Sequence, residues 1–287
     1  MRKIIFHTFL LIFVSTACSK FARLQKSTDL IEKYEGAMAY YEKESYEKSS
    51  LLLEEIIPLL KGRKEGEMAQ YRVSYCYYYM GQYELASFYF KRFYQTYGRS
   101  EYAQEAMFMQ AYCLYKDSPE YNLDQANTKQ AIAAIQNYLN AYPTTERLEE
   151  ANAIIKELRA KLEKKAYANA LQYYKMKNYK AAIVVLENFQ QDYPDSDYVE
   201  EVLFKKLEME YLLAKNSVRT KQQERYEAVM VTYDELLEEY PKSEYMKGAN
   251  SYYDNSVKKL ATLKQETDKK LQTEKEDKAN QEKEQPK

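Results

Sequence analysis

The sequence predicts an all-α protein, a solenoid of about five stacked helical hairpins. Three observations carry this prediction. A segment of fifteen to sixteen residues recurs five times along the 287-residue chain, its apolar positions follow the period of a helix, and most copies end at a glycine or proline. A repeated unit of this size buries its apolar face only against its neighbours, so the repeat determines the architecture.

The copies differ in clarity but share one pattern of buried positions. They start at Tyr46, Tyr83, Thr128, Tyr179 and Tyr226. Offsets 0, 3, 7, 10 and 14 from each start are aromatic, small or apolar, which is the spacing of one buried helical face. At offset 15, four copies carry a residue that stops a helix: Gly98, Pro143, Pro194 and Pro241.

A second helix lies upstream of three of these starts. Nine and six residues before the start come a small residue and a tyrosine: Ala37 and Tyr40, Ser74 and Tyr77, and Ala170 and Tyr173. A helix–turn–helix unit with this small and aromatic interlock resembles the tetratricopeptide repeat, whose pattern ends with the same spacing. The resemblance covers about residues 30–260, and the tyrosine of each pair is expected in the core.

The spacing between starts grows from 37 residues to 45, 51 and 47. Taking 37 as the local period, the excesses are 8, 14 and 10 residues. The first excess is expected in a turn over Lys116–Asn127. The second lies inside Glu146–Lys177, which has no glycine or proline, and fourteen residues are roughly four turns of a longer helix. The third is expected as a polar turn over Asn216–Arg225.

The amino terminus is predicted to be a secretory signal, residues 1–17. Arg2 and Lys3 precede an apolar run that is too short for a membrane span, which needs roughly 20 residues. Small residues then lead directly to Cys18. This arrangement resembles the lipobox of bacterial lipoproteins, so Cys18 is expected to carry a diacylglycerol and an N-acyl chain. The alternative is an ordinary signal with an incidental cysteine. No other cofactor is expected.

The two ends of the mature chain are expected to lie outside the solenoid. Residues 18–29 are predicted to be a tether after the lipidated cysteine. Residues 264–287 contain seven basic and seven acidic residues, with Leu271 as their single large apolar residue. Such a segment cannot bury enough surface to fold alone, so it is predicted to be a charged, disordered tail. A solvated extension of the last helix is the alternative.

Composition argues against catalysis and against nucleic-acid binding. The single histidine, His7, lies in the signal, and no metal or nucleotide motif is present. The formal net charge is −1 without a basic cluster, so nucleic acid has no electrostatic basis for binding. Cys76 and Cys113 occupy equivalent first-helix positions, where stacked helices hold backbones roughly 8–10 Å apart. A disulfide needs less than about 7 Å, so both are expected as buried, reduced thiols.

Tyrosine is the abundant residue, with 32 copies and no tryptophan. Many tyrosines come as neighbours, and the second of each pair is turned about 100° from the core, toward the concave surface that such repeats expose. Tyrosine is enriched at interfaces because it combines apolar contact with a hydroxyl group. The alternative is that these side chains pack against neighbouring helices. The predicted peptide-binding stripe is Tyr34, Met38, Tyr41, Tyr71, Tyr75 and Tyr78.

The segment Leu158–Pro194, together with the lipobox, the five repeats and the interrupted third repeat, resembles the BamD family of outer-membrane assembly lipoproteins, also called ComL or YfiO. The resemblance implies a lipid-anchored protein on the periplasmic face of the outer membrane. Its implied partners are the β-barrel insertase BamA, other assembly lipoproteins and unfolded outer-membrane proteins.

By position, the resemblance assigns substrate recognition to residues 30–115 and partner contacts to residues 116–263. Another envelope scaffold lipoprotein, serving cell-wall or secretion machinery, would share the fold and the anchor but not these partners. A glycan-binding surface lipoprotein is a further alternative that the aromatic content favours weakly.

Overall fold

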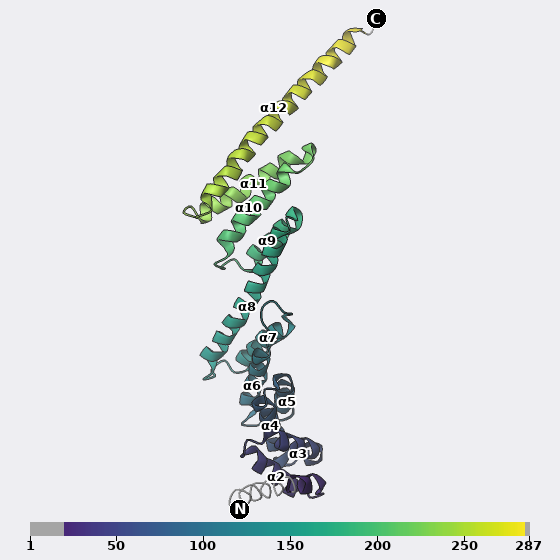
Figure 1. Cartoon of the computed structure of the whole chain (residues 1–287), viewed down its shortest axis with the longest axis vertical. Helices are drawn as coiled ribbons and strands as arrows, with labels where there is room; N and C mark the ends of the chain where they lie inside the picture. Colours follow the sequence, from purple (N-terminus) through teal and green to yellow (C-terminus); the bar gives the residue numbers. More distant parts are fainter. Residues whose placement is uncertain (1–19, 285–287) are drawn as a thin grey trace, which may run out of the picture. The chain divides into compact units, whose positions relative to one another are not determined.

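The regular structure of the described residues, 20–284, is helical throughout in a computed structural model (Figure 1). Side chains are described as far as residue 276. Beyond a short helical segment at residues 20–26, the helices are α2 (Leu30–Tyr41), α3 (Tyr46–Ile56), the 3-10 helix η1 (Ile57–Leu60), α4 (Lys64–Tyr79), α5 (Tyr83–Thr96), α6 (Ala103–Lys116), α7 (Ala126–Ala141), α8 (Leu148–Lys175), α9 (Tyr179–Asp192), α10 (Val199–Lys215), α11 (Arg219–Glu239) and α12 (Met246–Glu284).

Consecutive helices form the five predicted hairpins, α2–α3, α4–α5, α6–α7, α8–α9 and α10–α11, and this confirms the all-α repeat fold. Four of the second helices begin at the predicted start or within two residues of it. The small residue at offset 3 and the large residue at offset 10 are buried in every repeat. The offset-3 residues are Ser49, Ala86, Ala131, Ala182 and Val229, and the offset-10 residues are Ile56, Phe93, Tyr138, Phe189 and Leu236.

Four of the second helices, α5, α7, α9 and α11, end two residues before the predicted stop, each at a tyrosine cap. Tyr97, Tyr142, Tyr193 and Tyr240 leave the helical conformation, with φ between −116° and −137°. Their N–H groups still donate to the carbonyl four residues back, at 2.8–2.9 Å. Three of these caps precede proline, which disfavours the helical conformation in the residue before it.

The turn after each cap is built the same way four times. A serine or threonine three residues beyond the tyrosine donates its N–H to the tyrosine carbonyl, at 2.9–3.2 Å. Its side-chain oxygen accepts the N–H of the residue two positions further on, at 3.1–3.2 Å. A hydroxyl that bonds its own backbone in this way fixes a turn. The four residues are Ser100, Thr145, Ser196 and Ser243.

Two of the three insertions lie where the spacing predicts them. The first is the loop between α6 and α7, and the second lengthens α8 to 28 residues. The third prediction is wrong, because Arg219–Arg225 is helical and the turn is confined to Asn216–Val218. This stretch has no glycine or proline to stop a helix, and Arg219 forms an ion pair with Glu266 of α12.

The chain divides into two compact units, one ending at Leu162 and one beginning at Glu163. Helix α8 contributes to both, with Ile154 and Leu158 in the core of the first unit and Ala170 in the core of the second. Each unit therefore has its own apolar core.

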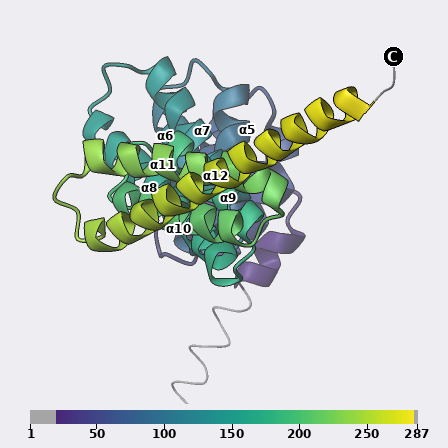
Figure 2. The same cartoon turned by 90° about the horizontal axis from the view of Figure 1, so that it is seen from above.

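Helix α12 differs from the disordered tail that the sequence predicts for residues 264–287. Ala249, Ser256 and Leu263 are buried in the second unit, and the helix then continues to Glu284 with exposed side chains as far as they are described. Figures 1 and 2 show α12 running alongside α11 and extending beyond it. Lysine, glutamate and glutamine favour a helix, and no glycine or proline lies between Leu263 and Glu284, so this segment is the helix extension that was the alternative to a disordered tail.

The prediction that residues 18–29 form a tether outside the solenoid is wrong from residue 20 onward. Residues 20–26 are helical, and Leu24 is buried against repeat one. The predicted signal, residues 1–17, and the predicted lipidation site, Cys18, lie outside the described residues. They remain predictions.

Candidate peptide-binding surface

Helices α2 and α4 hold the six residues predicted to bind peptides. Tyr34, Met38, Tyr75 and Tyr78 are half-buried and keep part of their surface open to solvent. Tyr41 and Tyr71 are only 9% and 8% exposed. These two side chains pack against neighbouring helices, which was the alternative to peptide binding.

Tyr41 packs where α2, α3 and α4 meet. Its ring stands edge-on to Tyr46, with centroids 5.5 Å apart, and the Arg72 guanidinium lies 4.7 Å from its centroid. Burial raises the pKa of Tyr41 to about 12, so the hydroxyl stays protonated. Tyr41 is a packing residue, and its assignment to the binding stripe is corrected.

Tyr71 lies inside an aromatic cluster. It stacks on Tyr102 with centroids 4.6 Å apart, and it also contacts Phe93 at 5.2 Å. Burial raises the pKa of its hydroxyl. The second unit repeats this stack with Tyr167 on Tyr198, at 4.0 Å. Because the same contact recurs between repeats, Tyr71 is a structural residue, and its assignment to the stripe is corrected as well.

Tyr75 and Tyr78 lie beside this cluster and remain partly open. The Tyr75 ring stands edge-on to Phe90, and its hydroxyl donates to Glu105 at 3.0 Å. Burial, with hydrogen bonding next, raises the pKa of Tyr75. The Tyr78 ring lies 5.9 Å from Tyr83 and 6.3 Å from Tyr112, and it keeps part of its surface open to solvent.

Tyr79 is a surface residue that the sequence interpretation missed. It is 51% exposed and stacks on Tyr46 with centroids 4.7 Å apart. An open cavity of about 500 Å³ lies beside the pair, lined in part by Tyr46, Lys48 and Met80. The periodicity assigned only the second tyrosine of each pair to the surface. The run Tyr77-Tyr78-Tyr79 at the end of α4 was the signal for a third.

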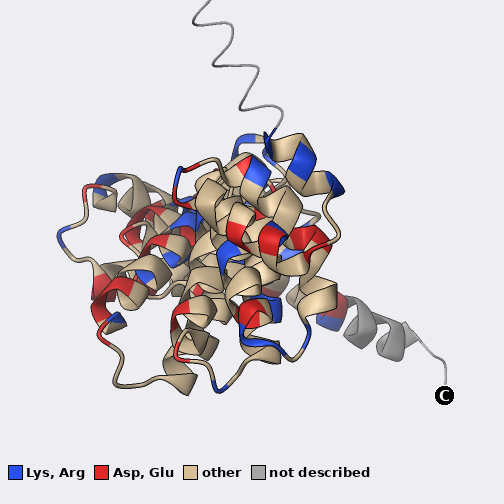
Figure 3. Ribbon diagram, turned by 90° about the horizontal axis from the view of Figure 1, so that it is seen from below, with Lys and Arg blue, Asp and Glu red and all other residues tan. Residues whose placement is uncertain are grey.

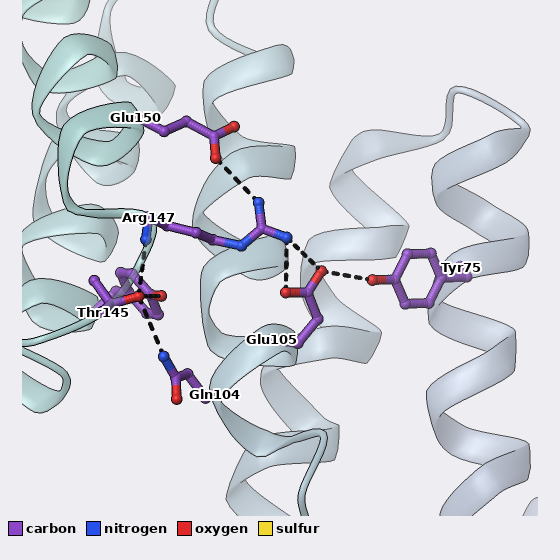
Figure 4. Close-up of polar contacts among 7 residues, drawn as sticks. Tyr75, Gln104, Glu105, Thr145, Arg147 and Glu150 are labelled. Atoms are coloured by element: carbon purple, nitrogen blue, oxygen red, sulfur yellow. Dashed lines mark hydrogen bonds and ion pairs between the residues drawn. The ribbon is translucent and has the colours of Figure 1, made fainter.

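An arginine-centred cluster joins α4, α6 and the start of α8 (Figure 4). One nitrogen of Arg147 lies 2.9–3.0 Å from both oxygens of Glu105, and the other donates to Glu150 at 3.0 Å. The guanidinium lies 4.3 Å from the centroid of Phe108. Arg147 follows the Thr145 turn at the position that Tyr102, Tyr198 and Tyr245 occupy in the other turns, so it replaces an aromatic contact with a cation–π contact.

Carboxylates of neighbouring helices engage many other tyrosine hydroxyls. Such pairs fix the orientation of the rings and place negative charge among them. They are Tyr77 and Tyr89 with Glu54, Tyr115 with Glu157, Tyr167 with Glu201, and Tyr174 with Glu208. Glu54 and Tyr89 lie on second helices, and the other members of these pairs lie on first helices, whose surfaces therefore carry aromatic rings together with carboxylates. Within the described residues, no group of three histidine, cysteine or acidic side chains is placed to hold a metal ion.

The two cysteines in the described chain are buried free thiols, as predicted. Burial raises the pKa of Cys76 to about 11 and that of Cys113 to about 12. Both therefore stay protonated and unreactive near neutral pH. None of the described helices has the length and apolar character needed to cross a membrane.

Comparison with known proteins identifies the family. A family model described as "YfiO: Outer membrane lipoprotein" matches residues 26–226. The "Outer membrane protein assembly factor BamD" of Caulobacter vibrioides is 30% identical over 134 residues, which are 47% of this chain and 44% of that protein. The chain thus matches less than half the length of that relative.

Among solved structures, the "TPR2AB-domain:pHSP90-complex of yeast Sti1" aligns over 79% of this chain and 98% of its own, at 11% identity and a TM-score of 0.36. The family match covers most of the chain and confirms the resemblance inferred from the sequence. The chain belongs to the YfiO family of outer membrane lipoproteins.

Proposed function

We propose that this protein is a non-catalytic, lipid-anchored scaffold of the outer-membrane β-barrel assembly machinery. It would hold unfolded outer-membrane proteins next to the insertase BamA on the periplasmic face of the membrane. Family membership and the name of the Caulobacter relative support this role. The observation that carries the binding step is the partly exposed aromatic and acidic surface of α2 and α4.

The binding surface that we propose consists of Tyr34, Met38, Tyr75, Tyr78 and Tyr79, which keep part of their surface open to solvent. These residues expose ring edges and a flexible thioether, which suit the alternating apolar side chains of an extended β-barrel segment. The buried Tyr41 and Tyr71 support the surface from beneath. Because contacts between tyrosines and with Glu105 already fix these rings, binding costs little side-chain entropy.

The acyl chains on Cys18 would keep the scaffold at the membrane, and the repeats after residue 116 would contact the insertase and other assembly lipoproteins. A substrate bound to α2 and α4 is then tethered near its site of insertion. Tethering raises the effective concentration of the substrate at the insertase, without any new contact between the two.

The binding surface is tested by replacing Tyr78 and Tyr79 together with alanine. We expect a β-barrel-derived peptide to bind about five- to tenfold more weakly, measured by fluorescence anisotropy. Circular dichroism should show that the variant is still folded at the assay temperature, although it loses the stack of Tyr79 on Tyr46. The matched control replaces Tyr173 and Met176 of the second unit, which should leave affinity unchanged. Tyr173 was expected in the core, but it is 40% exposed. Equal affinities for all three proteins would refute the assignment.

Co-purification from native membranes tests the wider role. Recovery of a β-barrel insertase with the protein supports the assembly function. Recovery of cell-wall or secretion components, with no insertase present, would favour the alternative of another envelope scaffold.

A further inference from the structure

Residues 20–26 form a short helix that is seated on α2. Leu24 is 3% exposed, and the Phe21 ring stands edge-on to Tyr40 with centroids 5.6 Å apart. Gly36 of α2 makes room for this contact. A Cβ atom at position 36 would lie 2.6 Å from a terminal methyl group of Leu24, so a larger side chain there displaces Leu24. The segment is therefore docked through a specific notch.

Polar contacts with Glu32 of α2 also hold residues 20–27 in place. Arg23 forms an ion pair with Glu32 at 3.2 Å, and the hydroxyl of Ser27 donates to the same carboxylate at 2.6 Å. Asp29 then caps α2 by accepting the N–H groups of Ile31 and Glu32. The connection between the segment and repeat one is thus fixed along its length.

The exposed charged side chains of this segment are all cationic. Lys20, Arg23 and Lys26 are exposed, and residues 20–28 contain no acidic side chain. Glu32 neutralises Arg23 only in part, because the pair is open to solvent and such pairs are weak. Figure 3 shows Lys and Arg positions beside the point where the described chain begins.

We propose that residues 20–26 are a rigid membrane-binding foot, whose face of Lys20, Arg23 and Lys26 lies on anionic lipid headgroups. This inference rests on the proposed acylation of Cys18, which places a lipid anchor two residues before Lys20. Three residues of extended chain reach at most about 10 Å, so the bilayer surface must lie that close to the docked Phe21. At this distance the cations add electrostatic attraction to the hydrophobic anchor.

The consequence is a fixed connection instead of a free tether. Because Phe21 and Leu24 are locked onto α2, the acyl chains and the cationic face engage the membrane together. Repeat one, with the Gly36 notch, is then held at the lipid surface.

The electrostatic part is tested on the unacylated full mature chain, made with Cys18→Ser. It should co-sediment with vesicles of phosphatidylcholine mixed with phosphatidylglycerol, and not with phosphatidylcholine alone. Replacing Lys20, Arg23 and Lys26 by glutamine should weaken this binding at least about tenfold. The matched control replaces the exposed Lys180, Lys242 and Lys247 by glutamine. Equal losses in both variants, or no binding by the parent chain, would overturn the proposal.

The docking part is tested on the acylated protein in the same vesicles. Trypsin cuts after Arg23 or Lys26 only if the segment leaves α2. Gly36→Leu, which fills the notch while favouring the helix, should speed release of fragments beginning at Leu24 or Ser27. Ala39→Leu, on an exposed position of α2, should not.

A second pair, Phe21→Ala with Leu24→Ala, removes the contact from the other side and should act like Gly36→Leu. Unchanged release in both, with unchanged melting of the folded chain, would refute the docking. Labelling of Cys18 with radioactive fatty acid distinguishes the proposed acylation from the proposed membrane binding by residues 20–26. Absent labelling defeats the lipid anchor but leaves the vesicle result standing, whereas normal labelling without vesicle binding defeats the foot alone.

Discussion

At the residue scale, Glu210 is a buried carboxyl that lacks a full set of partners. It lies in α10, is 8% exposed, and its Oε2 atom makes no hydrogen bond within the described residues. Burial raises its pKa from the usual 4.5 to about 7, although Thr232 and Lys206 oppose this shift. The folded chain therefore binds this proton more tightly than the unfolded chain does.

This difference predicts a pH-dependent stability. The contribution of Glu210 is fully present below about pH 4.5 and is lost as pH rises through about 7, a change of about 3 kcal/mol. Glu210→Gln should therefore raise the urea midpoint at pH 8 and leave it nearly unchanged at pH 4. Glu238→Gln, at an exposed position of α11, is the control. A pH profile identical to that of the parent chain would contradict the prediction.

Tyr71 gives a second prediction at the same scale. Tyr71→Ala removes the stack on Tyr102 and the contact with Phe93, so it should destabilise the chain by about 3 kcal/mol. Tyr71→Phe keeps both contacts and should unfold close to the parent temperature. Thermal unfolding followed by circular dichroism distinguishes the two. A marginal effect of alanine would show that Tyr71 is not a packing residue.

At the scale of elements, the sequence predicted the buried residues of the second helices correctly. It did not predict which residues of the next repeat cover the first helices. Offsets 3 and 10 identified buried residues in all five repeats because those positions face their own hairpin. The phase of Tyr71 indicated the direction of its side chain, but not that Tyr102, from a turn 31 residues later, would cover it. Exposure on an inner surface depends on the next repeat, which local periodicity does not describe.

The repeated turn was predicted only in part. Gly98 and the prolines marked the stops, whereas the hydroxyl that closes each turn was not recognised. Thr145 is the most connected example, because its side chain also bonds Tyr138 and Gln104. Thr145→Val should cost about 1–2 kcal/mol, measured by urea unfolding. Thr144→Val, at the exposed neighbouring position, should cost far less, and equal costs would contradict this account of the turn.

At the scale of the whole molecule, each of the two units has its own buried apolar clusters, and helix α8 contributes residues to both units. The second core includes Leu186, Leu203 and Leu236, and it needs only residues after Leu162. The sequence did not predict this division, because the repeat pattern continues through it. The long helix that the spacing did predict is the element shared by both units.

This division predicts that residues 163–287 fold alone. The fragment should show a helical circular dichroism spectrum and one cooperative thermal transition. Under the proposed function it should also retain the insertase in co-purification while losing affinity for β-barrel peptides. A non-cooperative transition would show that the second core depends on the first unit.

The burial of Cys76 and Cys113 has a practical consequence for future work. Neither thiol in the described chain is open to a labelling reagent, and acylation would block Cys18. A cysteine introduced at an exposed site such as Lys247 can thus be labelled without removing the native ones. The protein can carry a fluorophore or a spin label in its native membrane setting with its core unaltered.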